Sequence, residues 1–253
     1  GCMPPKSHGW RESSGVTRHE KKISVVGLRV CYPQGGEKQL IFAVLGREVP
    51  SRGLPMDVGV VVQNVATAAA IYDAAYLKKP LIDRVVTLSG SSAVRPGNYL
   101  VPIGTLVSDF LSATGGLKTD KPLKKIIMGG PMMGLALFSL QVPIMKGTSG
   151  ILCWDAEDVG IVPEPGVCIR CGRCVEGCPM RLMPLQLKAV IDREQLDKAD
   201  SDGLMDCIEC GCCGYSCPAK LPLVQTLKLG KKKVSDSARR KAQAEKSNQG
   251  ASS

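Results

Sequence analysis

The sequence predicts a multidomain α+β protein, because three segments of different character follow one another along its 253 residues. The first joins an apolar strand to helices, the second is typical of a β-hairpin followed by a helix, and the third holds a block of closely spaced cysteines. With 44% apolar residues and a net charge of +10, the chain is long enough for one to three small domains with cores. The composition excludes a collagen-like chain and an intrinsically disordered one.

The first residues carry no pattern that indicates a helix or a strand, and we expect residues 1–21 to be unstructured. The chain begins with Gly1, and its opening stretch lacks the basic start and apolar run of a signal peptide. We therefore expect a fragment whose natural start is missing. His8 and His19 fall in this stretch with no companion at metal-ligand spacing, and we expect no role for either.

An α/β segment is expected over residues 22–78. Within it, residues 22–30 indicate a strand, and residues 32–36 a turn into a helix with one apolar face. The wholly apolar run 58–62 predicts a buried parallel strand, and Asn64 is suited to cap the helix that follows. A strand that runs into a helix N-terminus can bind an anion, because the first amide groups of the helix are unpaired.

A small β-grasp-like module is expected over residues 79–150. Residues 84–90 and 99–104 indicate two strands on either side of a turn at residues 95–98. A short helix over residues 105–113 follows, and a pair of glycines ends it. This hairpin and helix are too small to stand alone, so we expect an inserted module.

The uncharged stretch 126–145 has the length of a membrane span. Glycines and prolines near both of its ends, among them Gly129, Pro131 and Pro143, would leave backbone groups unsatisfied in lipid. These residues favour a buried strand, loop and strand over a span. We therefore expect any membrane association to be peripheral, through a partner.

Nine of the twelve cysteines lie between Cys168 and Cys217, in two copies of the spacing C-x2-C-x2-C-x3-C-P. Such tight spacing in a chain of this length indicates metal ligation in a reducing compartment rather than a disulfide scaffold. Three thiolates at every third residue can hold three irons of one cluster, while the fourth cysteine serves the second cluster. The sequence thus predicts two 4Fe–4S clusters with crossed ligands. The ligands are Cys168, Cys171, Cys174 and Cys217 for the first cluster, and Cys207, Cys210, Cys213 and Cys178 for the second.

Structural zinc is the alternative for these cysteines, but a zinc site needs four ligands and would leave thiolates of each copy unused. Cys212 occupies a non-ligand position next to a ligand and is interpreted as a bystander, with ligand exchange as the alternative. Cys2, Cys31 and Cys153 lie outside the block and are expected to be unligated.

Helices are expected to carry the cysteine loops, which predicts a helical ferredoxin-type domain over residues 160–230. Residues 184–200 indicate a helix with Pro184 in its first turn, and residues 221–223 open another helix. Residues 231–253 complete a basic tail that we interpret as solvated. The alternatives for the tail are docking to an acidic protein or lipid surface and nucleic-acid binding, although it has no aromatic residue to stack on bases.

Seven motifs in this order resemble the C subunit of the Rnf (Rsx) ion-translocating electron-transport complex over roughly residues 22–230. They are YPQGGEKQL, GLPMDVGVVVQNVATAAAIYDA, PGNYLVPIGT, GGPMMG, KGTSGIL, CIRCGRCVEGCPMRLMP and CIECGCCGYSCPAKLPLVQ. The resemblance implies a remnant of a flavin- and NADH-binding α/β domain like that of the complex I flavoprotein. A soluble-ligand-binding β-grasp module and a domain with two 4Fe–4S clusters then follow.

The resemblance also implies FMN contacts at the starts of two predicted helices, where the complex I flavoprotein has Gly-Glu-Glu and Asn-Asn followed by Thr. The corresponding residues here are Gly36, Glu37, Lys38, Gln63, Asn64 and Thr67. The glycine-rich loop that cradles flavin and nucleotide in relatives has no counterpart in residues 1–21, so we expect only part of a flavin site. The alternative for these residues is a turn, a helix start and an N-cap.

The family implies an iron–sulfur electron-transfer subunit of a complex that passes electrons between NADH and ferredoxin while moving Na+ or H+. Its partners would be integral membrane and other subunits, and its place the cytoplasmic face of the membrane. A cobalamin (corrinoid) reductase with the same domain order is the alternative, and a nucleic-acid-binding protein with structural clusters is a remote one. No catalytic triad or carboxylate pair stands out in the sequence.

Overall fold

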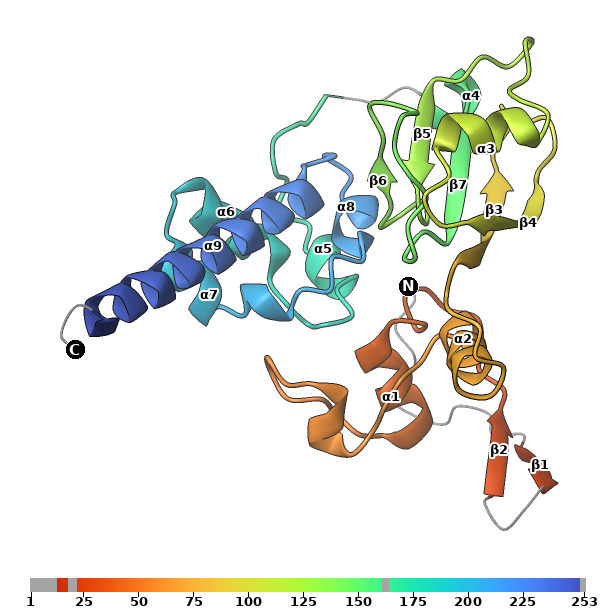
Figure 1. Ribbon diagram of the computed structural model, residues 1–253. Helices are drawn as coiled ribbons and strands as arrows, with labels where there is room; N and C mark the ends of the chain where they lie inside the picture. Colours follow the sequence, from red (N-terminus) through yellow and green to blue (C-terminus); the bar gives the residue numbers. More distant parts are fainter. Residues whose placement is uncertain (1–12, 18–21, 161–163, 251–253) are drawn as a thin grey trace. The chain divides into compact units, whose positions relative to one another are not determined.

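The computed structural model describes residues 13–17, 22–160 and 164–250, which divide into two compact units (Figure 1). One unit combines residues 1–62 with residues 165–253, and the other comprises residues 63–164.

The unit of residues 63–164 contains a five-stranded mixed sheet with the strand order β4-β3-β7-β5-β6 (Figure 1). The strands are β3 Asp83–Ser89, β4 Gly97–Pro102, β5 Lys125–Met128, β6 Leu135–Ala136 and β7 Gly150–Trp154. β3 pairs antiparallel with β4 and parallel with β7, and β5 pairs antiparallel with β6 and β7. The predicted hairpin is therefore present, and it is the edge of a larger sheet.

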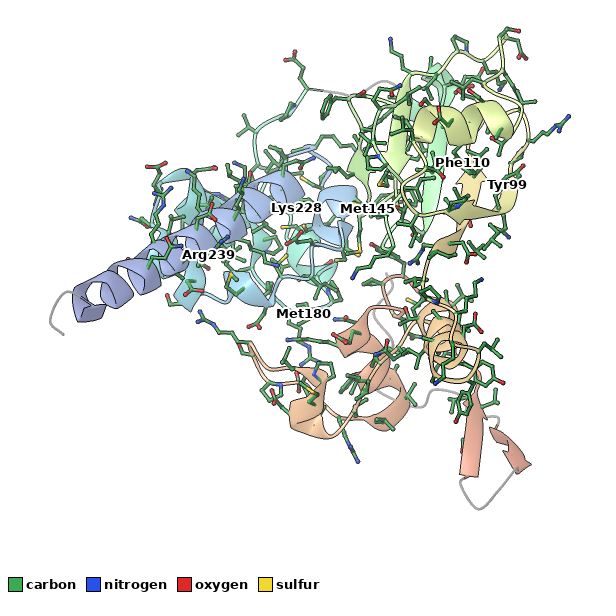
Figure 2. All side chains as sticks on the ribbon, viewed as in Figure 1. Tyr99, Phe110, Met145, Met180, Lys228 and Arg239 are labelled. Atoms are coloured by element: carbon green, nitrogen blue, oxygen red, sulfur yellow. The ribbon has the colours of Figure 1, made fainter. Side chains whose placement is uncertain are left out.

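Helix α3, Val107–Ala113, covers one face of this sheet (Figure 1). Exposed and buried residues alternate along β3, so that Val86 and Leu88 enter the core beneath the helix. Phe110 of α3 meets Tyr99 of β4 edge to face, with ring centroids 5.7 Å apart (Figure 2). The apolar residues that alternate along β3 and the apolar face of α3 thus pack into one core.

The apolar stretch 126–145 forms β5, a turn, β6 and a loop inside this unit, so the predicted strand, loop and strand are present, but both residues of β6 are exposed rather than buried. Ile126, Ile127 and Ile144 are buried. Among the described residues, no helix combines the length and the apolar character that a membrane span requires. The unit closes with the short helix α4, Ala156–Val159, which Asp155 caps through a hydrogen bond from the Asp158 amide.

Helix α2, Val65–Tyr76, begins this unit and has the predicted N-cap. The Asn64 side chain accepts a hydrogen bond of 2.9 Å from the Ala66 amide. None of the residues of α2 is buried. This alanine-rich helix therefore depends on its cap and its intrinsic propensity rather than on burial in a core.

In the other unit, the first elements are strands β1 and β2, helix α1 and the 3-10 helix η1. β1, Ser13–Thr17, pairs antiparallel with β2, Lys22–Val26, although we expected no structure in residues 1–21. α1 spans Glu37–Leu45 and η1 spans Pro55–Val58. The remainder of the first 21 residues lies outside the described part of the chain.

The buried strand predicted over residues 58–62 is wrong. η1 ends at Val58, and Gly59 follows with a φ of +70°, a left-handed conformation that interrupts an extended run. Residues 60–62 then continue without regular structure, and the Val61 side chain is 72% exposed. An apolar run becomes a buried strand only where neighbouring strands pair with it, and the described residues provide no such partner here.

The cysteine-rich part of this unit is helical, as predicted. Its elements are α5 Arg173–Glu176, α6 Pro184–Asp192, α7 Leu196–Ser201, η2 Leu204–Asp206, α8 Cys212–Ser216 and α9 Leu223–Gly250. α6 and α7 pack along α9 (Figure 1). Leu187, Ile191, Leu204, Leu223 and Leu227 are buried in the core between them.

The predicted tail from residue 231 is not separate from this core, because α9 continues unbroken through Gly250. Basic residues are distributed along this helix, from Lys228 to Arg239 and beyond (Figure 2). Gly230 lies where α9 crosses α6, and an added Cβ there would approach the Ile191 side chain to 2.5 Å. Leu223, Leu227 and Gly230 are buried in the first two turns of α9, so the helix is anchored in the core before the boundary that composition suggested.

A test of the sheet unit is the substitution Gly90→Ala. Gly90 has a φ of +105°, and a Cβ would lie 2.2 Å from the Cys153 carbonyl oxygen. We expect a loss of about 3 kcal/mol or more in the free energy of unfolding, because backbone rather than a flexible side chain must move. Urea unfolding measures it.

The matched control is Gly104→Ala, where φ is +99° but nothing lies within 4 Å of the added Cβ. It should cost only the conformational strain, about 1 kcal/mol. Equal losses in the two variants would contradict the packing at the end of β3.

Candidate functional site

The two cysteine-rich copies adopt the same local backbone at equivalent positions. The residue two places after the first cysteine is left-handed in both copies, Arg170 at φ +54° and Glu209 at φ +57°. The glycine after the second cysteine is left-handed as well, Gly172 at φ +76° and Gly211 at φ +88°. Non-glycine residues rarely adopt this conformation, so its repetition indicates that both loops need the same backbone geometry.

This backbone turns amide groups toward sulfur. The Arg170 amide donates to Cys168 Sγ and the Glu209 amide to Cys207 Sγ, each over 3.4 Å. The Leu182 amide donates to Cys178 Sγ, also over 3.4 Å. Amide donors of this kind stabilise a thiolate and tune a cluster held by it.

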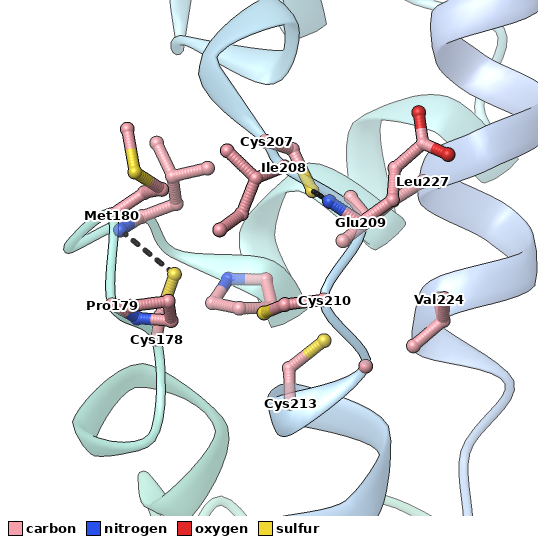
Figure 3. Close-up of a pocket in the computed structure, with 13 residues that line it drawn as sticks. Cys178, Pro179, Met180, Cys207, Ile208, Glu209, Cys210, Cys213, Val224 and Leu227 are labelled. Atoms are coloured by element: carbon pink, nitrogen blue, oxygen red, sulfur yellow. Dashed lines mark hydrogen bonds between the residues drawn. The ribbon is translucent and has the colours of Figure 1, made fainter. Parts of the chain in front are cut away.

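One cavity is lined by Cys178 of the first copy and by three cysteines of the second, Cys207, Cys210 and Cys213 (Figure 3). Figure 3 shows these four side chains gathered around the same space, with the amide of Glu209 bonded to the Cys207 sulfur. Most of the other lining residues are apolar, although Glu209 also lines the cavity, and the apolar side chains limit the access of water to the sulfurs. They include Pro179, Met180, Ile208, Val224 and Leu227.

A second cavity is lined by three cysteines of the first copy, Cys168, Cys171 and Cys174, and by Cys217 of the second. Its other lining residues are mostly apolar as well, among them Val175, Leu185, Leu221 and Leu223. Cys171 is exposed, whereas Cys217 is buried. The structure therefore brings the eight cysteines together in the two sets named from their spacing, while iron ligation itself stays a prediction.

Burial makes several of these thiols poor acids. It raises the pKa of Cys213 to about 12 and also raises the pKa of Cys207, Cys178 and Cys174. Without a bound metal, these four cysteines would hold neutral thiols near pH 7, because charged sulfurs in apolar surroundings need a cation. Loading such a site releases protons.

The donor set fits a polynuclear cluster better than a single ion. Among the described residues, no group of three or more histidine, cysteine or acidic side chains is arranged to hold one metal ion. Eight sulfurs in two fours, with amide donors and apolar walls, are what two 4Fe–4S clusters require. Each loop contributes to both cavities, so one site cannot form without the other loop.

The remaining cysteines of the described chain lie outside these linings. Cys212 precedes Cys213 in α8, and burial together with the charge of Cys210 raises its pKa to about 12. Burial raises the pKa of Cys153, in β7 of the sheet unit, to about 11. Cys31 lies in the turn before α1.

The predicted FMN contacts fall in both units. Gly36, Glu37 and Lys38 stand at the N-terminal end of α1, in the unit that holds the cysteines. The other three stand at the start of α2 in the sheet unit; they are Gln63, Asn64 and Thr67. The Asn64 side chain serves as an N-cap, which was the alternative considered for it.

No spacing or periodicity indicated that residues 31–52 would pack on the cysteine-rich part of the chain. The Tyr32 hydroxyl donates to the Cys210 carbonyl over 2.5 Å, and the Gln39 amide donates to Met180 Sδ over 2.8 Å. Burial, with the charges of Cys210 and Cys212, raises the pKa of Tyr32, so its hydroxyl stays a donor at neutral pH. The segment that carries the first group of FMN candidates thus touches the loop directly.

Asp206, just before the second loop, anchors the same segment. It accepts hydrogen bonds from Ser51 Oγ over 2.5 Å and from the Arg52 amide over 3.0 Å. Arg52 also pairs with Asp200 of α7, with 2.5 Å between Nη2 and Oδ1. These partners are about 150 residues apart in the chain, and no sequence motif connects them.

Lys231 of α9 is a further residue whose position differs from the expectation based on composition. Its Nζ donates to the Cys207 carbonyl over 2.8 Å and lies 2.9 Å from Glu209 Oε1. The prediction that this lysine belongs to a solvated tail is wrong for this position. Its spacing from the buried Leu223 and Leu227 along one helix face was the available signal.

The substitution Asp206→Ala tests whether this carboxylate anchors the segment of Ser51 and Arg52. Burial alone would raise the pKa of Asp206, but the hydrogen bonds from Ser51 and Arg52 and the charges of Lys38 and Arg52 lower it overall. The carboxylate therefore stabilises the docked segment above its ordinary pKa of 3.8, and this is lost as pH falls through the lowered value. Hydrogen exchange of the Arg52 amide measures it, and we expect acceleration of roughly tenfold or more in the variant.

The control is Asp197→Ala, an exposed carboxylate of α7. Exchange at Arg52 should not change in this variant. Unchanged exchange in Asp206→Ala would show that the anchor does not hold the segment.

Three family models match the chain. Residues 7–73 match the Nuo51 FMN-binding domain, residues 85–136 the SLBB domain and residues 160–218 a 4Fe-4S dicluster domain. The last match covers all eight cysteines that line the two cavities.

Curated relatives match most of the chain. Over 181 residues, 72% of this chain and 39% of the relative, it is 51% identical to the C subunit of the proton-translocating ferredoxin:NAD(+) oxidoreductase complex of Clostridium ljungdahlii. Over 216 residues, 85% of this chain and 48% of the relative, it is 44% identical to the Na(+)-translocating counterpart of Acetobacterium woodii. Over 236 residues, 92% of this chain and 30% of the relative, it is 43% identical to the C subunit of the ion-translocating oxidoreductase complex of Pseudomonas aeruginosa. The chain spans less than half the length of each of these relatives.

Proposed function

We propose that this chain, which is similar over most of its length to the C subunit of ion-translocating oxidoreductase complexes, is an iron–sulfur electron-transfer part of such a complex. The observation that carries the proposal is the sorting of eight cysteines into two apolar cavities, each lined by cysteines of both copies. That arrangement is suited to holding redox groups.

Cys168, Cys171, Cys174 and Cys217 would hold one 4Fe–4S cluster, and Cys207, Cys210, Cys213 and Cys178 the other. Such clusters exchange single electrons without making or breaking bonds of a substrate. The chain would fix the eight sulfurs, direct the amides of Arg170, Leu182 and Glu209 at them, and exclude water with apolar side chains. These eight cysteines would belong to a domain that we place at residues 160–230.

The names of the relatives supply the wider setting of the proposal. Ferredoxin and NAD(H) would be the redox partners, Na+ or H+ the translocated ion, and other subunits, some of them integral to the membrane, the structural partners. The chain itself would lie peripherally on the cytoplasmic face. The relatives' names support this function and not a cobalamin reductase.

FMN is the third cofactor of the proposal, supported by the match of residues 7–73 to an FMN-binding domain. Its expected contacts are Gly36, Glu37 and Lys38 in the cysteine-containing unit, and Gln63, Asn64 and Thr67 in the sheet unit. Residues 22–78 would form the flavin remnant and residues 79–150 the β-grasp module. The hydrogen bond from Tyr32 to Cys210 supports a flavin-side segment that touches the second loop.

Nucleic-acid binding by the basic helix is not favoured. Lys231 and Lys233 of α9 already pair with Glu209 and Glu194 over 2.9 and 3.0 Å. The helix also contains no aromatic residue for base stacking.

Anaerobic reconstitution with iron and sulfide tests the proposal. We expect about eight irons per chain and an EPR spectrum of two interacting centres after reduction. Cys178→Ser removes a ligand from the second cluster's cavity, so we expect that cluster to be lost or altered and the iron content to fall toward about four. Iron analysis and EPR are the measurements. Binding of added FMN is measured separately, from the absorbance of the flavin that stays bound to the chain.

Cys212→Ser is the matched control, because Cys212 lies beside a predicted ligand but outside both linings. It should keep about eight irons. A preparation that takes up one zinc and gives no spectrum would overturn the proposal, and an iron loss in Cys212→Ser equal to that in Cys178→Ser would overturn the ligand assignment.

A further inference from the structure

The second cysteine loop is held by a charged side chain from outside the motif. Lys231 Nζ donates to the carbonyl oxygen of Cys207 over 2.8 Å and forms an ion pair of 2.9 Å with Glu209, which lies between two of the cavity cysteines. The Lys231 side chain is 21% exposed and that of Glu209 is 33% exposed. The pair is thus partly withdrawn from water. Its charges are screened less there and act over longer distances than charges in bulk solvent.

The first copy provides an internal comparison. Its residue equivalent to Glu209 is Arg170, and its residue equivalent to Lys231 is Asp192, so the signs of both charges are reversed. Asp192 pairs with Lys188 of its own helix rather than with the loop. Among the described residues, no lysine donates to a carbonyl of the Cys168–Cys174 loop as Lys231 does to Cys207.

We propose that Lys231 is a positioning residue that raises the reduction potential of the cluster held by the Cys207–Cys213 loop, and that Glu209 moderates this effect. The inference rests on the proposed function, because it requires the cluster to be present. Cys207, Glu209 and Lys231 all belong to the unit that contains the cysteines, so their contacts lie within one unit.

The physical reason is the charge that reduction adds. One electron enters the site and no bond forms or breaks, so the net charge inside the cavity becomes more negative by one. A fixed ammonium beside the loop stabilises the reduced form, and a carboxylate destabilises it.

Opposite shifts in two variants distinguish this electrostatic role from a structural one. Lys231→Met removes the ammonium and leaves Glu209 unpaired, so the potential should fall. Glu209→Gln leaves Lys231 uncompensated and still bonded to Cys207, so the potential should rise. The double variant should lie between them, because both charges are removed together.

The experiment is an EPR-monitored redox titration of the reconstituted chain. At the wild-type midpoint of the affected wave, we expect the ratio of reduced to oxidised cluster to fall at least about threefold in Lys231→Met and to rise by a similar factor in Glu209→Gln. The affected wave is identified as the one that changes in Cys207→Ser. Lys231→Arg should restore the wild-type position, and Lys232→Met, an exposed neighbour on α9, should leave both waves in place.

The outcomes separate the inference from the proposed function. A wild-type chain without iron or EPR signals overturns the function. A chain with two clusters whose potentials do not move in Glu209→Gln overturns the inference. If Lys231→Met fails to hold its cluster, Glu209→Gln alone decides, because that variant keeps the bond from Lys231 to Cys207. A shift of the same sign in both variants also contradicts the inference.

Discussion

The crossing of the two cysteine-rich copies is the constraint on which the cysteine-containing unit depends. The fourth cysteine of each copy lines the cavity formed by the other copy, so neither site is complete within one stretch of sequence. The two loops must therefore lie against each other at a fixed distance. α6 and α9, which follow the two copies, meet this requirement by packing together through Leu187, Ile191 and Leu227.

The same constraint explains the strained backbone. Arg170 and Glu209 adopt left-handed conformations that cost a non-glycine residue free energy, and they do so at equivalent positions. In return, each presents its amide to a sulfur. The left-handed backbone thus turns these two amides into donors to the site.

Around this symmetric core, the surroundings of the two cavities differ. The second loop receives hydrogen bonds from Tyr32, which is far away in the sequence, and from Lys231 of α9. Asp206 holds the segment that contains Ser51 and Arg52 just ahead of that loop. Two sites with identical ligand spacing can therefore have different electrostatic environments, which is how a protein gives chemically equal clusters unequal potentials.

The sequence by itself determined the local features: the spacing of the eight cysteines, the cap of α2 at Asn64, the hairpin of β3 and β4, and the helix that begins at Pro184. Each depends on residues within a few positions of one another, and local propensity suffices to predict them. The run at residues 58–62 shows the limit, because whether an apolar segment becomes a strand depends on partners that composition does not reveal.

Tertiary structure alone decided the rest. Lys231 became a loop contact rather than a tail residue because α9 is anchored through Leu223 and Leu227, which turns that lysine toward Cys207. The contacts of Tyr32, Ser51 and Arg52 join segments about 150 residues or more apart, which only the folded chain brings together. Motif spacing encodes which atoms can bind a cofactor, whereas long-range packing fixes the charges and dipoles that surround it.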